Sequence, residues 1–437
     1  MEHMETTQSS REQPSSGKSP RVRIAILFFT LMVVMLGFGM IIPILPFYVE
    51  AFGGGGKEMG ALMAVFALMQ FVFAPVWGQL SDRHGRKVIL MVGVLGNAIS
   101  MLLFGLSTSM WMLIGSRALA GILSSATLPT AMAYIGDSTS EEDRGGGMGM
   151  MGAAMGVGMV LGPGLGGWLA SDSLSTPFFV AAGLSLVALV LVMLVLPESL
   201  PQEARTQQVG GVGSSQPRNL GQVLLGLVRF GLDLLRDLWQ ALFSPVGFLL
   251  VLSFLVSFGL TNFESVFGLY AKDRYDYSPG QVGTILTVIG LISALTQGLL
   301  TGPLTRRWGE LAIIRLSLLG SVVGFVLMLL PDTFAGVVLS VSFFILSNAM
   351  IRPAVSSLIS KRATGGQGVA MGLNNSFMSL GRVAGPMWAG AAYDLNLTYP
   401  YMSGAAVMLA GLVMSLFWQG QESAAKEGPV GEAEPAS

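Results

Sequence analysis

Cysteine is absent from this chain of 437 residues, which excludes disulfides, thiol catalysis and thiolate metal sites. Histidine is scarce too: His3 and His84 are too few and too far apart in the sequence to predict a metal site, so we expect none. Charge is the third deficit, since Asp, Glu, Lys and Arg make up 11% of the residues, against about 25% in a soluble domain. Most of the surface must therefore face something other than water.

Long apolar runs dominate the composition, because hydrophobic residues reach 52%. A segment that crosses a bilayer needs ~20 mostly apolar residues, and it should be helical because a lipid-exposed backbone must satisfy its own hydrogen bonds. We find about twelve such segments, at 24–49, 59–80, 88–108, 110–135, 146–170, 177–196, 246–271, 279–301, 311–330, 334–357, 368–391 and 399–419.

The distribution of basic residues predicts how these segments are oriented. With both termini in the cytoplasm, most of the 24 Lys and Arg residues fall in segments on the inner side, and the outer loops hold only Lys57, Lys272 and Arg274. Such a bias is the positive-inside rule, so we predict cytoplasmic termini. The apolar run from Ile24 to Val49 is longer than the core of a signal peptide, and we interpret it as a retained first span.

Composition divides the chain into five parts. We expect a disordered cytoplasmic tail at 1–22, a six-helix bundle at 23–197, a cytoplasmic linker at 198–244, a second six-helix bundle at 245–420 and a disordered cytoplasmic tail at 421–437. Within the linker, the segment 219–243 pairs a charged stripe with an apolar face, which is typical of a helix lying flat in the membrane interface. A thirteenth span is the alternative interpretation of that segment.

The two halves share landmarks in nearly constant register. The run Gly78 to Gly85 after the second span returns as Gly302 to Gly309 after the eighth, and Gly158 to Gly167 returns as Gly381 to Gly390, at offsets of 223 or 224 residues. Such a repeat predicts two pseudo-symmetric bundles with a substrate site between them near the membrane midplane. The predicted fold is an all-α integral membrane protein with twelve transmembrane helices in two six-helix bundles.

Several of these segments resemble a known family. Gly78 to Lys87 is similar to the signature loop of the major facilitator superfamily, and Leu36 to Pro46 resembles the first-span motif of its twelve-span drug:proton antiporters. Gly158 to Gly167 is similar to the fifth-span motif associated with antiporters. Three stretches of the second half resemble bacterial multidrug pumps of the quinolone-exporting type, with tetracycline exporters and glycolipid flippases as near neighbours: Asn262 to Phe267, Met350 to Ala354 and Gly372 to Phe377.

The chain departs from that pattern at two positions. Ala349 stands where such pumps often carry an acidic residue just before the Met-Ile-Arg-Pro segment, which puts part of the coupling or cation binding in doubt. Ala120 replaces the usual Gln of the span-four motif. Arg382, in the eleventh span, has no role that the sequence explains.

Glu264 is the strongest candidate for chemistry, because we find no other carboxylate deep inside a predicted span. An ionisable group there usually faces a cavity and functions, since a charge at the centre of a span disfavours insertion by about 2.5–3.5 kcal/mol. We expect Glu264 to alternate between holding a proton and attracting a cationic substrate. The alternative is a structural partner for a buried Arg.

Other candidates depend on the facing of their helices. The resemblance implies that Arg117 acts in proton coupling, with Glu264 or backbone carbonyls as its partners. A packing or snorkelling Arg is the alternative. Polar residues within spans line a cavity or bond across helices, and Phe side chains often face lipid instead. With these alternatives open, we expect substrate contacts from Asn262, Phe263, Glu264, Gln297, Asn348, Arg352, Asn374 and Phe377.

Two glycine-containing motifs are candidates for gating. The first can be a topology signal or a latch in which Asp82 caps another helix or pairs with Arg144; it consists of Gly78, Asp82, Arg83, Gly85 and Arg86. The glycines of the second motif let helices approach closely, so we expect its main role to be helix packing, and we expect any gating role to depend on that packing. This motif consists of Gly158, Gly162, Pro163, Gly166 and Gly167.

Taken with the resemblance, these features predict a secondary active transporter rather than an enzyme. No Gly-x4-Gly-Lys-Ser/Thr motif for ATP occurs, so we expect no cofactor and the proton gradient as energy source. We expect a monomer in the bacterial plasma membrane that exports hydrophobic or cationic drugs by proton antiport, with no nucleic-acid partner. Export or flipping of an endogenous lipid or metabolite is the alternative, and a non-transporting receptor or scaffold is a third.

Overall fold

The computed structural model describes residues 20–200, 236–244, 246–363 and 366–426. Most of the predicted linker at 198–244, and most of the predicted tails at 1–22 and 421–437, lie outside these ranges. In the part that is described, every regular element is a helix, and 11 helical stretches are long and apolar enough to cross a membrane. This confirms the predicted all-α membrane architecture.

The first half makes six crossings. Two short helices, α4 and α5, form one of them, because together they span Met110–Ser138 with only a brief break. The bounds are α1 Pro20–Ala51, α2 Gly56–His84, α3 Arg86–Gly105, α4 Met110–Ser124, α5 Thr127–Ser138, α6 Glu141–Leu169 and α7 Thr176–Val195.

The second half makes six more crossings within the described ranges. A π-helical turn, η1, joins α11 and α12 into one crossing, and α14 and α15 form another. The crossing α16 is 29 residues long but less apolar than the rest, because it carries Arg382 and Asp394. The bounds are α10 Gly247–Tyr275, α11 Pro279–Leu295, η1 Thr296–Leu300, α12 Thr301–Trp308, α13 Glu310–Leu327, α14 Phe334–Asn348, α15 Ile351–Arg362, α16 Gln367–Leu395 and α17 Tyr399–Lys426.

The internal repeat has a backbone counterpart. Gly85 separates α2 from α3 at a φ of 102°, and Gly309 separates α12 from α13 at a φ of 81°. Side chains rarely tolerate this region of φ, so glycine is the residue that lets both halves turn directly from one helix into the next. The two motif loops therefore share a geometry although their charged residues differ.

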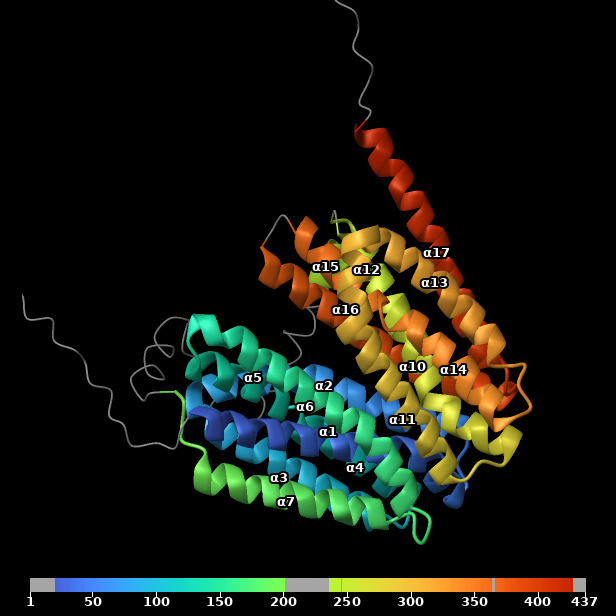
Figure 1. Cartoon of the computed structure of the whole chain (residues 1–437). Helices are drawn as coiled ribbons and strands as arrows, with labels where there is room; N and C mark the ends of the chain where they lie inside the picture. Colours follow the sequence, from blue (N-terminus) through green and yellow to red (C-terminus); the bar gives the residue numbers. More distant parts are fainter. Residues whose placement is uncertain (1–19, 201–235, 245, 364–365, 427–437) are drawn as a thin grey trace, which may run out of the picture.

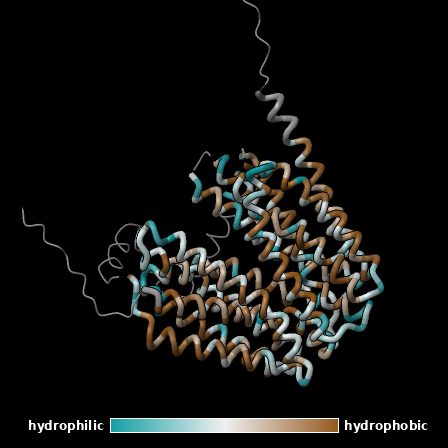
Figure 2. Tube along the Cα trace, viewed as in Figure 1, coloured by the Kyte–Doolittle hydropathy of each residue, from teal (hydrophilic) through white to brown (hydrophobic). Residues whose placement is uncertain are grey.

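Each bundle has two ends, which we name for reference. The basic end is the one where α2, α5, α12 and α15 finish and where Arg83, Lys87, Arg307 and Lys361 lie. The opposite end carries the α1–α2 and α10–α11 turns. In Figure 2, hydrophobic colour runs along the helices and hydrophilic colour gathers toward their ends. Leu194 and Leu339 are 71% and 70% exposed, as expected for side chains that face lipid.

The bundles form a V (Figure 1), joined toward the opposite end and diverging toward the basic end. The seam consists of glycine contacts between α2 and α16 and between α6 and α11. A Cβ added at Gly60 would lie 2.3 Å from the Pro386 carbonyl oxygen, and one at Gly167 would lie 2.4 Å from that of Pro279. Backbones in such close contact leave no room for side chains, so small residues define where the bundles meet.

Candidate functional site

A cavity of about 1090 Å³ lies between the two bundles. Its volume lies just above the range of about 300–1,000 Å³ that is usual for pockets holding drug-sized ligands. Residues of α1, α6, α10, α11, η1, α14 and α15 line it, so both bundles contribute walls. The lining is mainly apolar and includes Ile42, Met155, Met159, Val160, Leu260, Leu286, Ile289 and Ile345.

Glu264 of α10 is the one carboxylate among the residues that line this cavity. Within the described ranges it makes no hydrogen bond and no ion pair. Arg352 of α15 lines the same cavity, and the charges of Arg352 and Arg382 both act on the Glu264 carboxyl group. The carboxyl group is thus near cations but is not tied to either, which leaves it accessible to a proton or a ligand.

Three further predicted contacts line the cavity. Phe263 is 1% exposed and packs its ring against Phe344, with centroids 5.2 Å apart, so it forms a wall rather than a projecting contact. Asn348 is buried, and its amide nitrogen lies 3.5 Å from the Ser321 hydroxyl. Gln297, which donates to the Ser293 hydroxyl at 2.9 Å, is exposed in the π-helical turn.

Three other predicted contacts lie outside the cavity lining. Asn262 donates to the Pro400 carbonyl oxygen at 2.8 Å, and Asn374 accepts from the Ser253 hydroxyl at 2.6 Å. Phe377 is 7% exposed within the apolar core. The two amides join neighbouring helices, which is the alternative role that polar residues take in spans.

Sequence reasoning missed two walls of the cavity. On α6, Gly152 and Gly156 face open space, with nothing within 4 Å of an added Cβ, so they hollow the cavity by lacking side chains. The glycine spacing of this span was a signal for them, but it indicates packing as readily as an open face. The π-helical turn that places Gln297 and Gly298 at the cavity has no recognised sequence signal.

Arg117 is 1% exposed, and within the described ranges no carboxylate pairs with it. Its guanidinium lies over the rings of Phe66 and Phe104, 5.5 and 5.6 Å from their centroids, and contacts the Met63 sulfur at 3.7 Å. The sequence suggested Glu264 or backbone carbonyls as its partners. Aromatic faces take that place here, because they attract a desolvated cation through the ring quadrupole.

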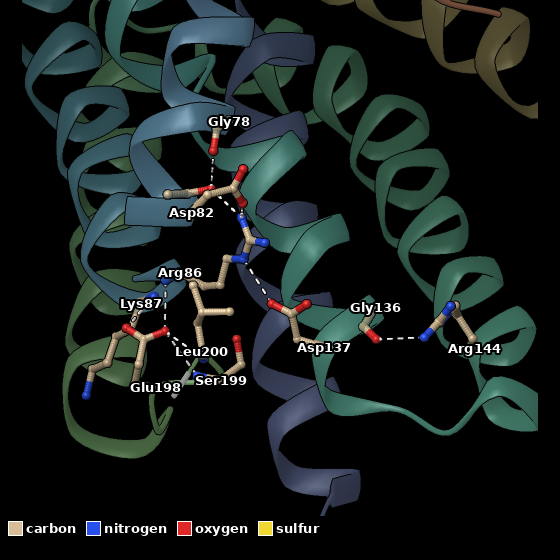
Figure 3. Close-up of polar contacts among 11 residues, drawn as sticks. Gly78, Asp82, Arg86, Lys87, Gly136, Asp137, Arg144, Glu198, Ser199 and Leu200 are labelled. Atoms are coloured by element: carbon tan, nitrogen blue, oxygen red, sulfur yellow. Dashed lines mark hydrogen bonds and ion pairs between the residues drawn. The ribbon is translucent and has the colours of Figure 1, made fainter. Parts of the chain in front are cut away.

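The first motif ties helices together inside one bundle (Figure 3). Arg86 forms an ion pair with Asp82, donates from Nε to Asp137 at 2.9 Å and from Nη1 to the Ser81 hydroxyl at 2.7 Å. Arg86 thus joins the end of α2, the start of α3 and the end of α5. Gly78 takes part through its carbonyl oxygen, which accepts from Ser81 at 2.8 Å.

Nearby groups complete this basic-end cluster. Glu198 accepts from the backbone nitrogens of Arg86 and Lys87 at 2.8 and 3.2 Å, which caps the start of α3. Arg144 donates to the Gly136 carbonyl oxygen at 3.2 Å (Figure 3), so the Asp82–Arg144 pair considered from the sequence is not formed in this arrangement. Arg83 is exposed.

The second motif packs α6 against two helices at once. An added Cβ at Gly158, Gly162 or Gly166 would lie 2.5, 2.7 or 2.5 Å from backbone oxygens of α1. Gly167 faces the other way, toward Pro279 and Gly283 of α11 in the second bundle. The Pro163 ring lies near Gly39 of α1, while its carbonyl oxygen would be 2.4 Å from a Cβ added at Gly283. The motif therefore forms the seam between the bundles on one side of the cavity.

Comparison with known proteins identifies the class to which this fold and site belong. The family model described as Major Facilitator Superfamily matches residues 27–386 and 249–436. The chain belongs to the major facilitator superfamily, a family of transporters. This confirms the resemblance predicted from its motifs.

Similar proteins of established name cover nearly the whole chain. Multidrug resistance protein 2 of Bacillus subtilis (strain 168) is 33% identical over 396 residues, covering 90% of this chain and 94% of that protein. Quinolone resistance protein NorA of Staphylococcus aureus (strain COL) is 30% identical over 405 residues, covering 93% and 98%.

Solved structures share the fold at lower sequence identity. A mutant of the peptide transporter POT in complex with sulfate aligns with a TM-score of 0.71 at 17% identity, covering 92% of this chain and 94% of that one. The human organic anion transporter MFSD10 aligns with a TM-score of 0.65 at 24% identity, covering 91% and 100%. These similarities establish the architecture, and the substrate class must be inferred from the residues of the site.

Proposed function

We propose that this chain is a proton-coupled antiporter that exports hydrophobic or amphipathic small molecules, cationic ones among them, by alternating access. The observation that carries the proposal is the cavity of about 1090 Å³ between the bundles, apolar except for a few groups and containing a carboxyl group with no direct partner in the described ranges. The multidrug and quinolone resistance relatives support a drug-like substrate.

The sidedness of the cycle follows from the basic residues. By the positive-inside rule the basic end faces the cytoplasm, so both termini are cytoplasmic in this proposal. A V that is joined at the opposite end is then the inward-open state, in which a compound from the cytoplasm or inner leaflet reaches the cavity. Tilting the bundles about the cavity would expose it to the outside.

Glu264 couples the two fluxes in this proposal. Its ionised form attracts a cationic group and its protonated form does not, so proton and cation compete for one site. Binding of one therefore favours release of the other, and this reciprocity is what links an inward proton to an outward substrate. The positive charges of Arg352 and Arg382 act on this same carboxyl group.

Proton flux across liposomes that contain purified protein tests the proposal. A pH-sensitive dye in the lumen reports proton movement while cationic, neutral and lipid-like compounds are added in turn. Antiport predicts that a transported compound drives protons in the opposite direction. Liposomes without protein should show neither compound transport nor proton movement. Compound transport without proton movement would refute the coupling, and movement of lipid-like compounds alone would favour an endogenous substrate.

A further inference from the structure

Asp394, near the end of α16, contacts the other bundle. Its carboxylate oxygens accept from the backbone nitrogens of Gly56 at 2.7 Å and Lys57 at 3.1 Å, in the first turn of α2. Those N–H groups have no acceptor inside their own helix, and a negative charge is stabilised at a helix N-terminus. A carboxylate of the second bundle thus completes a helix of the first.

The glycines around this contact bring the two backbones together. An added Cβ at Gly56 would lie 2.5 Å from the Gly390 carbonyl oxygen and 2.7 Å from Asp394 Oδ1. One at Gly390 would lie 2.1 Å from the Gly56 carbonyl oxygen. With so little side-chain volume between α2 and α16, few atoms interdigitate here. The two hydrogen bonds of Asp394 therefore give the contact its direction and register.

A second polar contact crosses the seam at the same end. Glu50 of α1 forms an ion pair with Lys272 of α10, and the Lys272 ammonium lies 5.8 Å from the centroid of the Phe47 ring. The Glu50 side chain is 55% exposed, so solvent weakens this pair. Asp394 is exposed too, but it is the more directional of the two contacts because each of its oxygens has its own N–H donor.

We propose that Asp394 is a latch that holds the opposite end closed, and that transport requires its release from Gly56 and Lys57. Any motion that opens this end must draw α16 away from α2, which breaks both hydrogen bonds together. While the latch is engaged, the cavity is accessible only from the basic end. The latch acts on the equilibrium between the two states, so it does not depend on the identity of the substrate or on Glu264.

Distance measurements between the bundles test the latch directly. The chain has no cysteine, so paired cysteines for spin labels can be introduced on an otherwise native sequence. Thr108→Cys and Leu397→Cys place labels at exposed positions of the two bundles at this end. Double electron–electron resonance on reconstituted protein then reports the populations in which this end is closed or open.

Loss of the carboxylate should shift those populations. We expect Asp394→Ala to raise the ratio of open to closed protein about tenfold, the size of effect that one hydrogen bond to a charged group supports. Asp394→Asn should shift it less, because an amide keeps one acceptor. The matched control is Asp332→Asn at the same end, where Asp332 is 92% exposed and lies 3.9 Å from Arg274 of its own bundle.

Two results would overturn the proposal. One is a distance distribution for Asp394→Ala that matches those of the parent and of Asp332→Asn. If Asp394→Ala fails to fold, the Asp394→Asn protein decides the question, and an unchanged distribution there would also reject the latch. Measuring proton coupling in the same proteins separates this outcome from a failure of the antiport mechanism, which concerns Glu264.

Discussion

Glu264 and Arg352 face one cavity from α10 and α15, yet no ion pair forms between them. A direct pair would neutralise both groups and fix their geometry, which suits a structural role. Separation in a partly open cavity leaves the carboxyl group accessible, while the cation still influences its charge state. This arrangement favours a functional carboxyl group over the structural alternative raised by the sequence.

Replacing that carboxyl group should separate transport from proton coupling. In Glu264→Gln the side chain keeps its shape but cannot release a proton, so uphill efflux driven by a pH gradient should fall to the level of empty membranes. Binding of neutral compounds and thermal stability should change little. Efflux assays in inverted vesicles measure this, with Glu142→Gln at an exposed position as control. Efflux equal to the parent's would reject Glu264 as the coupling group.

Ala349 gives a test of charge selectivity, because it lines the cavity close to Arg352 in sequence and space. Ala349→Asp adds a negative charge to the wall. We expect a permanently cationic amphiphile to bind about tenfold more tightly, from a Coulomb gain of roughly 1–2 kcal/mol, while a neutral one is unaffected. Competition binding with both compounds measures the ratio. The uncharged variant Ala349→Asn should leave the ratio of the two affinities unchanged. A change of that ratio in Ala349→Asn would indicate an effect of shape instead of charge.

The seam between the bundles predicts an effect of a single methyl group. Gly390→Ala would place a Cβ 2.1 Å from the Gly56 carbonyl oxygen, so α2 and α16 must move apart. We expect a loss of about 1–3 kcal/mol in the closed arrangement of the opposite end and reduced transport. Thermal unfolding and efflux measure the two effects. Gly372→Ala in the same helix meets nothing within 4 Å and should behave as the parent.

The basic-end cluster predicts which arginine stabilises the first bundle. Arg86→Ala removes the ion pairs to Asp82 and Asp137 and leaves two carboxylates close together. We expect a loss of about 1–2 kcal/mol, reduced by the partial exposure of both acids. Arg83→Ala, at an exposed position of the same motif, should change stability by much less. Equal unfolding temperatures for the two variants would contradict this role of Arg86.

The sequence predicted the helices and the repeat well, because both depend on local pattern. Hydropathy located the crossings, and the sequence repeat that contains Gly85 and Gly309 has a backbone counterpart, since both glycines have a positive φ. Glu264 could be singled out for a similar reason, since a carboxylate within an apolar span is conspicuous without any knowledge of its neighbours.

The direction in which a side chain faces, and its partners far away in the sequence, could not be predicted in the same way. Asn262 and Asn374 read like cavity residues, but they bond between helices, and the sequence does not state which side of a helix meets a neighbour. Asp394 and Gly56 are far apart in the chain, so nothing local signals their contact. The aromatic surroundings of Arg117 and the π-helical turn likewise depend on tertiary packing.

The modest hydropathy of α16 has a consequence for biogenesis. A helix with an arginine near its middle partitions poorly into lipid by itself, because a charge in the hydrocarbon region disfavours insertion. The cost falls when neighbouring helices surround that charge. The backbone of α16 lies against α10, where a Cβ at Gly381 would be 2.6 Å from the Phe254 carbonyl oxygen, and against α2 through Gly390. Stable integration of this segment therefore awaits earlier segments from both halves of the nascent chain.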